Sequence, residues 1–136
     1  MLVKFLPTYT GGGLGSINYL LNERKAAGTA KVVKGDENLT RAIIKGIDFK
    51  QKTCFGVLSF EEKHDFLTEE QKLKIIKDFE RALLGDYMLE RVNVLWVEHS
   101  DKNGRLELNF LIPKIDLITG KSFNPYLAKF DQHRID

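Results

Sequence analysis

The sequence of 136 residues is poor in the features that mark secreted and membrane proteins. Its single cysteine, Cys54, lies in an apolar run, so no disulfide can form within the chain and a reducing compartment is expected. No apolar run approaches the roughly 20 residues that span a bilayer, and the opening residues MLVK do not begin a signal peptide. We therefore expect a soluble, cytoplasmic protein with no membrane partner.

A strong excess of one charge sign is also missing. The chain has 21 Lys and Arg residues against 19 Asp and Glu residues, a formal net charge of +2. So small an excess permits an anionic partner but does not predict one, and any nucleic-acid binding must rest on a local site. The length suits one domain, and a hydrophobic content of 43% is that of a globular chain with a real core.

Strand and helix patterns alternate along the chain. Runs rich in strand formers predict strands over 2–6, 31–34, 54–60, 92–99 and 105–112. Ser16 is placed to cap a first helix, and a second helix is expected over 38–45. A longer helix begins at Thr68 with a capping box and ends at Gly85, and its inward stripe is expected to contain Leu73, Ile76, Phe79, Glu80 and Leu83. The pattern predicts an α+β fold, an antiparallel central sheet with packed helices.

The first helix sets one tyrosine apart from its apolar face. Ile17, Leu20 and Leu21 have spacings of three and four, which is typical of one buried face. At about 100° per residue, Tyr19 lies about 200° round from Ile17. We expect its side chain to meet solvent or a cleft.

The last two strands form a hairpin whose register decides which polar residues meet. A type I turn over 101–104, with Gly104 in the left-handed conformation, places His99 opposite Glu107 and Asn109 diagonal to His99. A two-residue turn at 103–104 would instead place His99 opposite Leu108 and send Glu107 to the other face.

In the first register, His99, Glu107 and Asn109 form a candidate metal site. One nitrogen and two oxygen ligands favour a hard divalent ion such as Mg²⁺ or Mn²⁺ over zinc. The ordinary alternative is that these residues line the solvated face of an antiparallel sheet, which by itself is the commoner arrangement.

Several motifs together resemble a known family. WVEHSDKNGRLELNFLIP, which contains His99 and the triplet at 107–109, is similar to the relaxases of mobilisable colicin-type plasmids. In these DNA-nicking enzymes a His-Glu-Asn set replaces the three histidines of other HUH relaxases. LVKFLP, the glycine cluster at 11–15, INYLL, GVLSFEE and IPKIDLITGKSFNPY follow in the family's order. The turn can be one residue shorter in the family, and both lengths set the histidine opposite the glutamate.

The resemblance implies a function, a fold and a set of site residues. Residues 1–136 would be an HUH-like relaxase catalytic domain, the N-terminal part of a longer protein. Tyr19 would attack a DNA phosphate in a plasmid transfer origin, leaving a 5′-phosphotyrosine link and a free 3′-hydroxyl. His99, Glu107 and Asn109 would hold Mg²⁺ or Mn²⁺. The nick would serve conjugative mobilisation, with accessory mobilisation proteins as further partners.

Other residues are weaker candidates for DNA contacts. Backbone groups at Gly12 and Gly13 are expected to hold a phosphate, although the glycines would serve nearly as well as a flexible connector. Arg105 shares the face of Glu107, where single-stranded DNA is expected to lie across an open sheet face. Tyr9 is the reserve nucleophile. The alternative function is a single-stranded nucleic-acid-binding module without catalysis, and a structural domain without chemistry ranks last.

Overall fold

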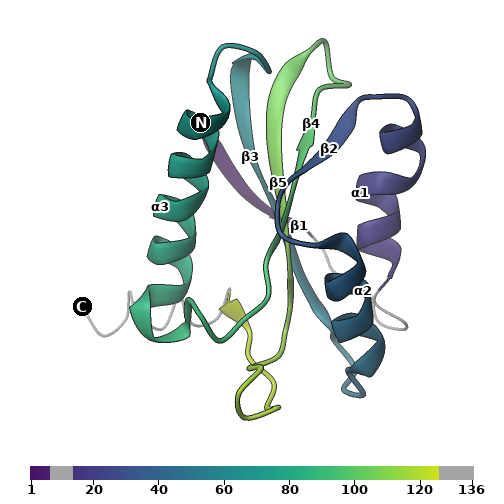
Figure 1. Cartoon of the computed structure of the whole chain (residues 1–136), viewed down its shortest axis with the longest axis vertical. Helices are drawn as coiled ribbons and strands as arrows, with labels where there is room; N and C mark the ends of the chain where they lie inside the picture. The colour runs from purple at the N-terminus through teal and green to yellow at the C-terminus, as the bar shows by residue number, and fades with distance from the viewer. Residues whose placement is uncertain (7–13, 126–136) are drawn as a thin grey trace.

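A five-stranded antiparallel sheet with strand order β1-β3-β5-β4-β2 forms the centre of the computed structural model, which describes residues 1–6 and 14–125 (Figure 1). The strands are β1 (Leu2–Leu6), β2 (Ala30–Lys34), β3 (Thr53–Lys63), β4 (Leu95–His99) and β5 (Arg105–Pro113). The helices are α1 (Gly15–Ala26), α2 (Glu37–Gly46) and α3 (Glu69–Met88). The predicted α+β fold with an antiparallel central sheet is confirmed.

Helix α3 packs on one face of the sheet and builds the larger core (Figure 1). Alternate residues of β5 point to this face, and Leu106, Leu108 and Phe110 have no exposed surface. Trp96 of β4 contacts both Phe110 and Phe79 of α3, with ring centroids 5.3 and 5.8 Å away. The apolar face that the sequence predicted for β5 is therefore the core face.

Helices α1 and α2 cover part of the other face, which the sequence led us to expect open (Figure 1). Their apolar residues pack on Phe55, Leu95, Val97 and Leu111. These strand residues are apolar, so this part of the sheet is buried on both sides and lacks the polar alternation of a solvated face. The remaining polar positions lie toward the hairpin end of β4 and β5.

Three local expectations were wrong. Ser16 lies inside α1 and does not cap it. Leu73 is 42% exposed, because Lys72 takes the inward position and its ammonium group pairs with buried Glu98 at 2.7 Å. Gly85, with φ of 74°, interrupts α3, but one more turn follows it. The capping box of Thr68 is confirmed.

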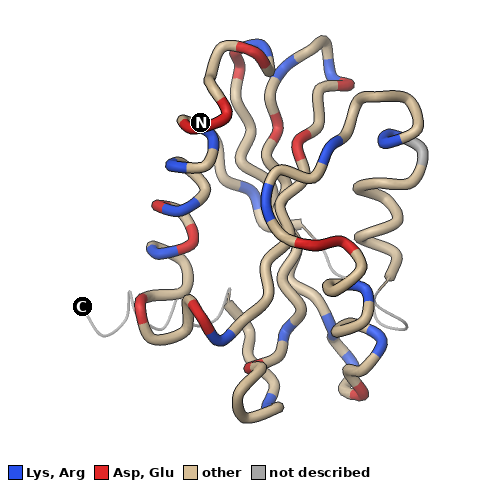
Figure 2. Tube along the Cα trace, viewed as in Figure 1, with Lys and Arg blue, Asp and Glu red and all other residues tan. Residues whose placement is uncertain are grey.

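Charged residues of both signs are interspersed along the trace, as Figure 2 shows, which fits the net charge of +2. Among the helices of residues 1–6 and 14–125, none has the length and apolar character needed to cross a membrane.

Gly56 of β3 allows β1 to approach closely. A Cβ atom at this position would lie 2.8 Å from the carbonyl oxygen of Lys4 and would also meet the ring of Phe110. We expect Gly56→Ala to lower the free energy of unfolding by about 1 to 3 kcal/mol, because neither the backbone oxygen nor the buried ring can yield without displacing a strand. Gly46→Ala is the matched control, since a Cβ there meets nothing within 4 Å. Equal urea midpoints for the two variants would contradict this account.

Candidate active site

The β4–β5 hairpin has the register that brings the predicted polar residues together. His99 pairs with Glu107, and Val97 pairs with Asn109. His99, Glu107 and Asn109 therefore point to the same face of the sheet, away from the core that α3 covers. The predicted register is confirmed.

The turn that produces this register is not the one that the sequence predicted. Asn103 and Gly104 both have positive φ, 58° and 72°, and the N–H of Arg105 donates to the carbonyl of Lys102 at 3.1 Å. This two-residue turn was expected to send Glu107 to the opposite face. Between the turn and the first strand pair, however, the β4 side has one residue more than the β5 side. This irregularity restores the pairing of His99 with Glu107.

The imidazole of His99 is held in one orientation and one tautomer. Its side chain is 3% exposed, and Nε2 lies 2.8 Å from the carbonyl oxygen of Leu20 in α1. Because a carbonyl oxygen only accepts, Nε2 donates this hydrogen bond, and in the neutral ring Nδ1 then keeps a lone pair. Burial lowers the pKa of His99, against the opposing effect of the Leu20 hydrogen bond. A neutral ring with one nitrogen oriented by a backbone carbonyl suits a metal ligand.

The ligand atoms of His99, Asp101 and Glu107 lie within 4.8 Å of one another. The sequence reasoning assigned Asp101 only to the turn. Its position two residues after His99 was the available signal, since side chains two apart along a strand share a face. The amide nitrogen of Asn109 donates to the carbonyl of Val97 at 3.3 Å, so the amide oxygen is the atom left for a cation. One imidazole nitrogen with carboxylate and amide oxygens is a donor set that fits Mg²⁺ or Mn²⁺.

Two cations balance the acidic side chains of this group. The Nε atom of Arg24 lies 2.8 Å from Oδ2 of Asp101, and the Nζ atom of Lys102 lies 3.6 Å from Oε2 of Glu107. Burial opposes ionisation of Asp101, but the hydrogen bond and charge of Arg24 outweigh it and lower the pKa of this carboxyl group. Asp101 is therefore held as a carboxylate.

Tyr19 lies on the exposed side of α1, as predicted, with 53% of its surface exposed. The guanidinium carbon of Arg24 sits 4.5 Å from the centre of its ring, and Nη2 is 3.5 Å from its hydroxyl oxygen. The ring packs in a T-shaped arrangement with Phe55, with centroids 6.2 Å apart. Arg24 thus contacts both Tyr19 and Asp101, and it links the first helix to the hairpin.

A cavity of about 170 Å³ joins the tyrosine to the polar residues of the hairpin. Its lining includes Tyr19, Arg24, His99, Glu107 and Asn109. The structure therefore brings together the predicted nucleophile and all three predicted ligands. Arg105 is exposed and lines a neighbouring cavity instead. Three other predicted residues, Tyr9, Gly12 and Gly13, lie outside the described residues.

Comparisons with known proteins give two relatives over the whole chain. The sequence is 41% identical over 136 residues to the cryptic plasmid protein C of Neisseria gonorrhoeae and 42% identical over the same length to the DNA relaxase MbeA of Escherichia coli. The chain spans 65% of the first relative and 26% of the second, which is less than two thirds of either. No family model and no solved structure matches it. Both alignments include all 136 residues of this chain, and they bear out the predicted resemblance to a plasmid DNA relaxase.

Proposed function

We propose that this protein nicks one strand of plasmid DNA at a transfer origin, for conjugative mobilisation, by metal-dependent tyrosine transesterification. The observation that carries the proposal is the single cavity that Tyr19 shares with His99, Glu107 and Asn109. The similarity to a DNA relaxase over all 136 residues supports the same activity. Residues 1–136 are proposed to act as the catalytic domain, with single-stranded DNA around the nick as substrate and accessory mobilisation proteins as partners.

Tyr19 is the proposed nucleophile. Its hydroxyl oxygen forms a bond to the phosphorus of the scissile phosphodiester while the bond from phosphorus to the 3′ oxygen breaks. The proton of the hydroxyl group is lost to solvent and the departing 3′ oxygen gains one. The part of the strand on the 3′ side of the nick stays on the tyrosine through its 5′ phosphate. Because one phosphoester bond replaces another, the 3′-hydroxyl can later reverse the step and rejoin the strand.

His99, Glu107 and Asn109 are the proposed metal ligands, and Asp101 joins them as a second carboxylate. When bound, Mg²⁺ or Mn²⁺ supplies Lewis-acid stabilisation for a non-bridging oxygen of the phosphate. The Leu20 carbonyl keeps the His99 ring in the tautomer that a ligand needs.

Arg24 is proposed to position the nucleophile. Its guanidinium group packs on the Tyr19 ring, and Nη1 donates to the Tyr19 carbonyl oxygen at 2.8 Å. The same group holds Asp101 at 2.8 Å. The tyrosine and the hairpin ligands are thereby fixed relative to one another before DNA arrives, which reduces the ordering that the reaction requires.

The test is covalent adduct formation. Single-stranded oligonucleotides that tile the transfer region of the plasmid encoding the protein are incubated with the chain in Mn²⁺, in Mg²⁺ and in a chelator. We expect one oligonucleotide to give a denaturation-resistant protein–DNA band with either ion and none with the chelator, and the DNA-linked peptide to contain Tyr19. Tight binding of an oligonucleotide without an adduct in either metal would favour the alternative, a binding module without catalysis.

A further inference from the structure

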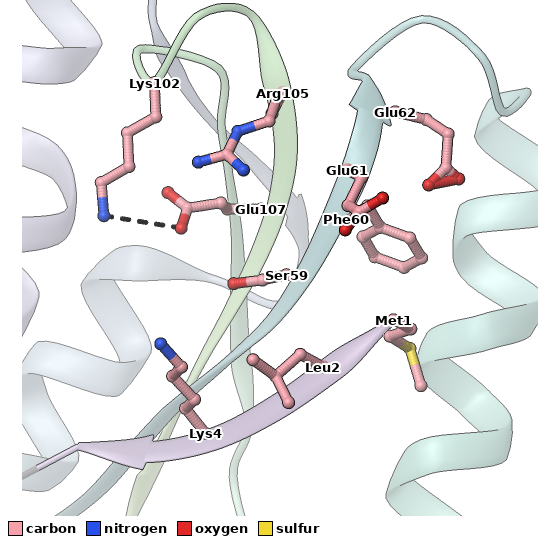
Figure 3. Close-up of a pocket in the computed structure, with 10 residues that line it drawn as sticks. All are labelled: Met1, Leu2, Lys4, Ser59, Phe60, Glu61, Glu62, Lys102, Arg105 and Glu107. Carbon is pink, nitrogen blue, oxygen red and sulfur yellow. Dashed lines mark ion pairs between the residues drawn. The ribbon is translucent and has the colours of Figure 1, made fainter.

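A second cavity, of about 470 Å³, adjoins the one that contains Tyr19 (Figure 3). Lys4, Ser59, Lys102 and Glu107 line both cavities. Because they share these four residues, the two cavities lie side by side on the same face of the sheet. For a DNA strand whose scissile phosphate lies beside Tyr19, the second cavity is therefore a neighbouring place for the next nucleotide.

This second cavity lies over the part of the sheet face that α1 and α2 leave uncovered. Its floor crosses β1, β3 and β5, where Leu2 pairs with Ser59 and Ser59 pairs with Glu107. Met1 and Leu2 add exposed apolar surface at its border, 68% and 56% exposed. Such surface suits the sugar or base of a nucleotide.

The cavity is cationic at one end only. Lys4, Lys102 and Arg105 lie at the end that adjoins Glu107, and Figure 3 shows Arg105 extending over Glu107 with Lys4 on the other side of it. Lys102 pairs with Glu107, but among the side chains that the structure describes no ion pair involves Lys4 or Arg105. Glu61 and Glu62 line the far end, together with Phe60 (Figure 3). An anion is therefore attracted to the near end and repelled from the far end.

We propose that Lys4 and Arg105 bind the DNA phosphodiester next to the scissile one. Glu61 and Glu62 repel the following phosphate, so that the cavity binds this one phosphate only. The inference rests on the proposed function, which identifies the ligand as single-stranded DNA. It adds the place where this DNA leaves the cavity that contains Tyr19. Lys4 and Arg105, which pair with no carboxylate among the described side chains, hold the DNA backbone beside the acidic metal-binding group without competing for its ligands.

The first test measures DNA binding in the Tyr19→Phe background, so that no adduct forms. The ligand is the oligonucleotide that gives the adduct or, if none does, the tightest-binding member of the tiled set. We expect Lys4→Gln with Arg105→Gln to reduce the slope of log affinity against log salt by about 0.7, the effect of one lost single-strand phosphate contact. Lys74→Gln with Lys77→Gln removes two cations from α3, on the other side of the sheet, and should leave the slope unchanged.

The second test replaces single phosphates by neutral methylphosphonates. At one position next to the nick, we expect the substitution to weaken binding by the Tyr19→Phe protein about tenfold and to have no effect once Lys4 and Arg105 are also changed. Glu61→Gln with Glu62→Gln should tighten binding. Undiminished sensitivity of the Lys4 and Arg105 variant at every position would overturn the inference. Because adduct formation by the wild-type chain on unmodified DNA is scored separately, failure here leaves the proposed nicking function standing.

Discussion

Tyr19→Phe is expected to abolish the covalent DNA adduct and to lower strand cleavage by on the order of 10⁴-fold or more, as loss of an enzyme's nucleophile does. The change removes one hydroxyl group and keeps the ring, so the contacts with Phe55 and with the guanidinium of Arg24 remain. Because Tyr19 is 53% exposed, the fold should lose little stability. The measurement is the yield of adduct on a denaturing gel, at matched thermal midpoints.

Tyr87→Phe provides a closely matched control. Tyr87 is also exposed, its ring lies under an arginine at 4.8 Å from the guanidinium carbon of Arg91, and its hydroxyl accepts from Nη1 of that residue at 2.7 Å. It lies near the end of α3 and lines neither of the two cavities. Full adduct yield in Tyr87→Phe is therefore expected. An adduct that persists in Tyr19→Phe would move the nucleophile to another tyrosine, with Tyr9 the first to test.

The parts of the site that local patterns determine could be predicted from the sequence. The period of two in β5 fixed which face Glu107 and Asn109 share, and the period of 3.6 in α1 placed Tyr19 away from the apolar face. Register also followed, although through a different turn. A turn type determines the strand register only when both strands have the same number of residues between the turn and the first strand pair. The sequence alone did not reveal that the β4 side has one residue more.

Contacts between distant segments could not be predicted in this way. Arg24 and Asp101 are separated by 77 positions, and no local period relates them. Helical periodicity showed that α1 has an apolar face but not which sheet face it covers, so the coverage of the second face was missed. The closeness of Asp101 to His99 and Glu107 was missed for a local reason, since a residue beyond the end of a strand is ordinarily a turn residue.

The metal ligands can be tested by removing them one at a time. His99→Gln is expected to lower Mn²⁺ affinity at least about 100-fold, since removing even a residue that only orients a ligand costs roughly 10- to 100-fold. Calorimetric titration with Mn²⁺ measures the loss directly, and the metal concentration needed for half-maximal nicking should rise with it. Glutamine retains a donor for the Leu20 carbonyl, whereas alanine would leave this buried oxygen unpaired at a cost of about 1 to 3 kcal/mol. His64→Gln changes an exposed histidine and should leave the affinity unchanged.

The same titration tests whether Asn109, the ligand that the sequence predicted, and Asp101, the ligand that the structure adds, both bind the ion. If Asn109 holds the ion, Asn109→Leu weakens Mn²⁺ binding, and if Asp101 holds it, Asp101→Asn does so. Asp101→Asn also removes the ion pair with Arg24, which by itself should move Tyr19 and lower the nicking rate at saturating metal. Affinity therefore reports the ligand role, and the rate at saturation reports the positioning role. We expect both Asn109→Leu and Asp101→Asn to weaken the ion's binding, and unchanged affinity in either variant would remove that residue from the metal site.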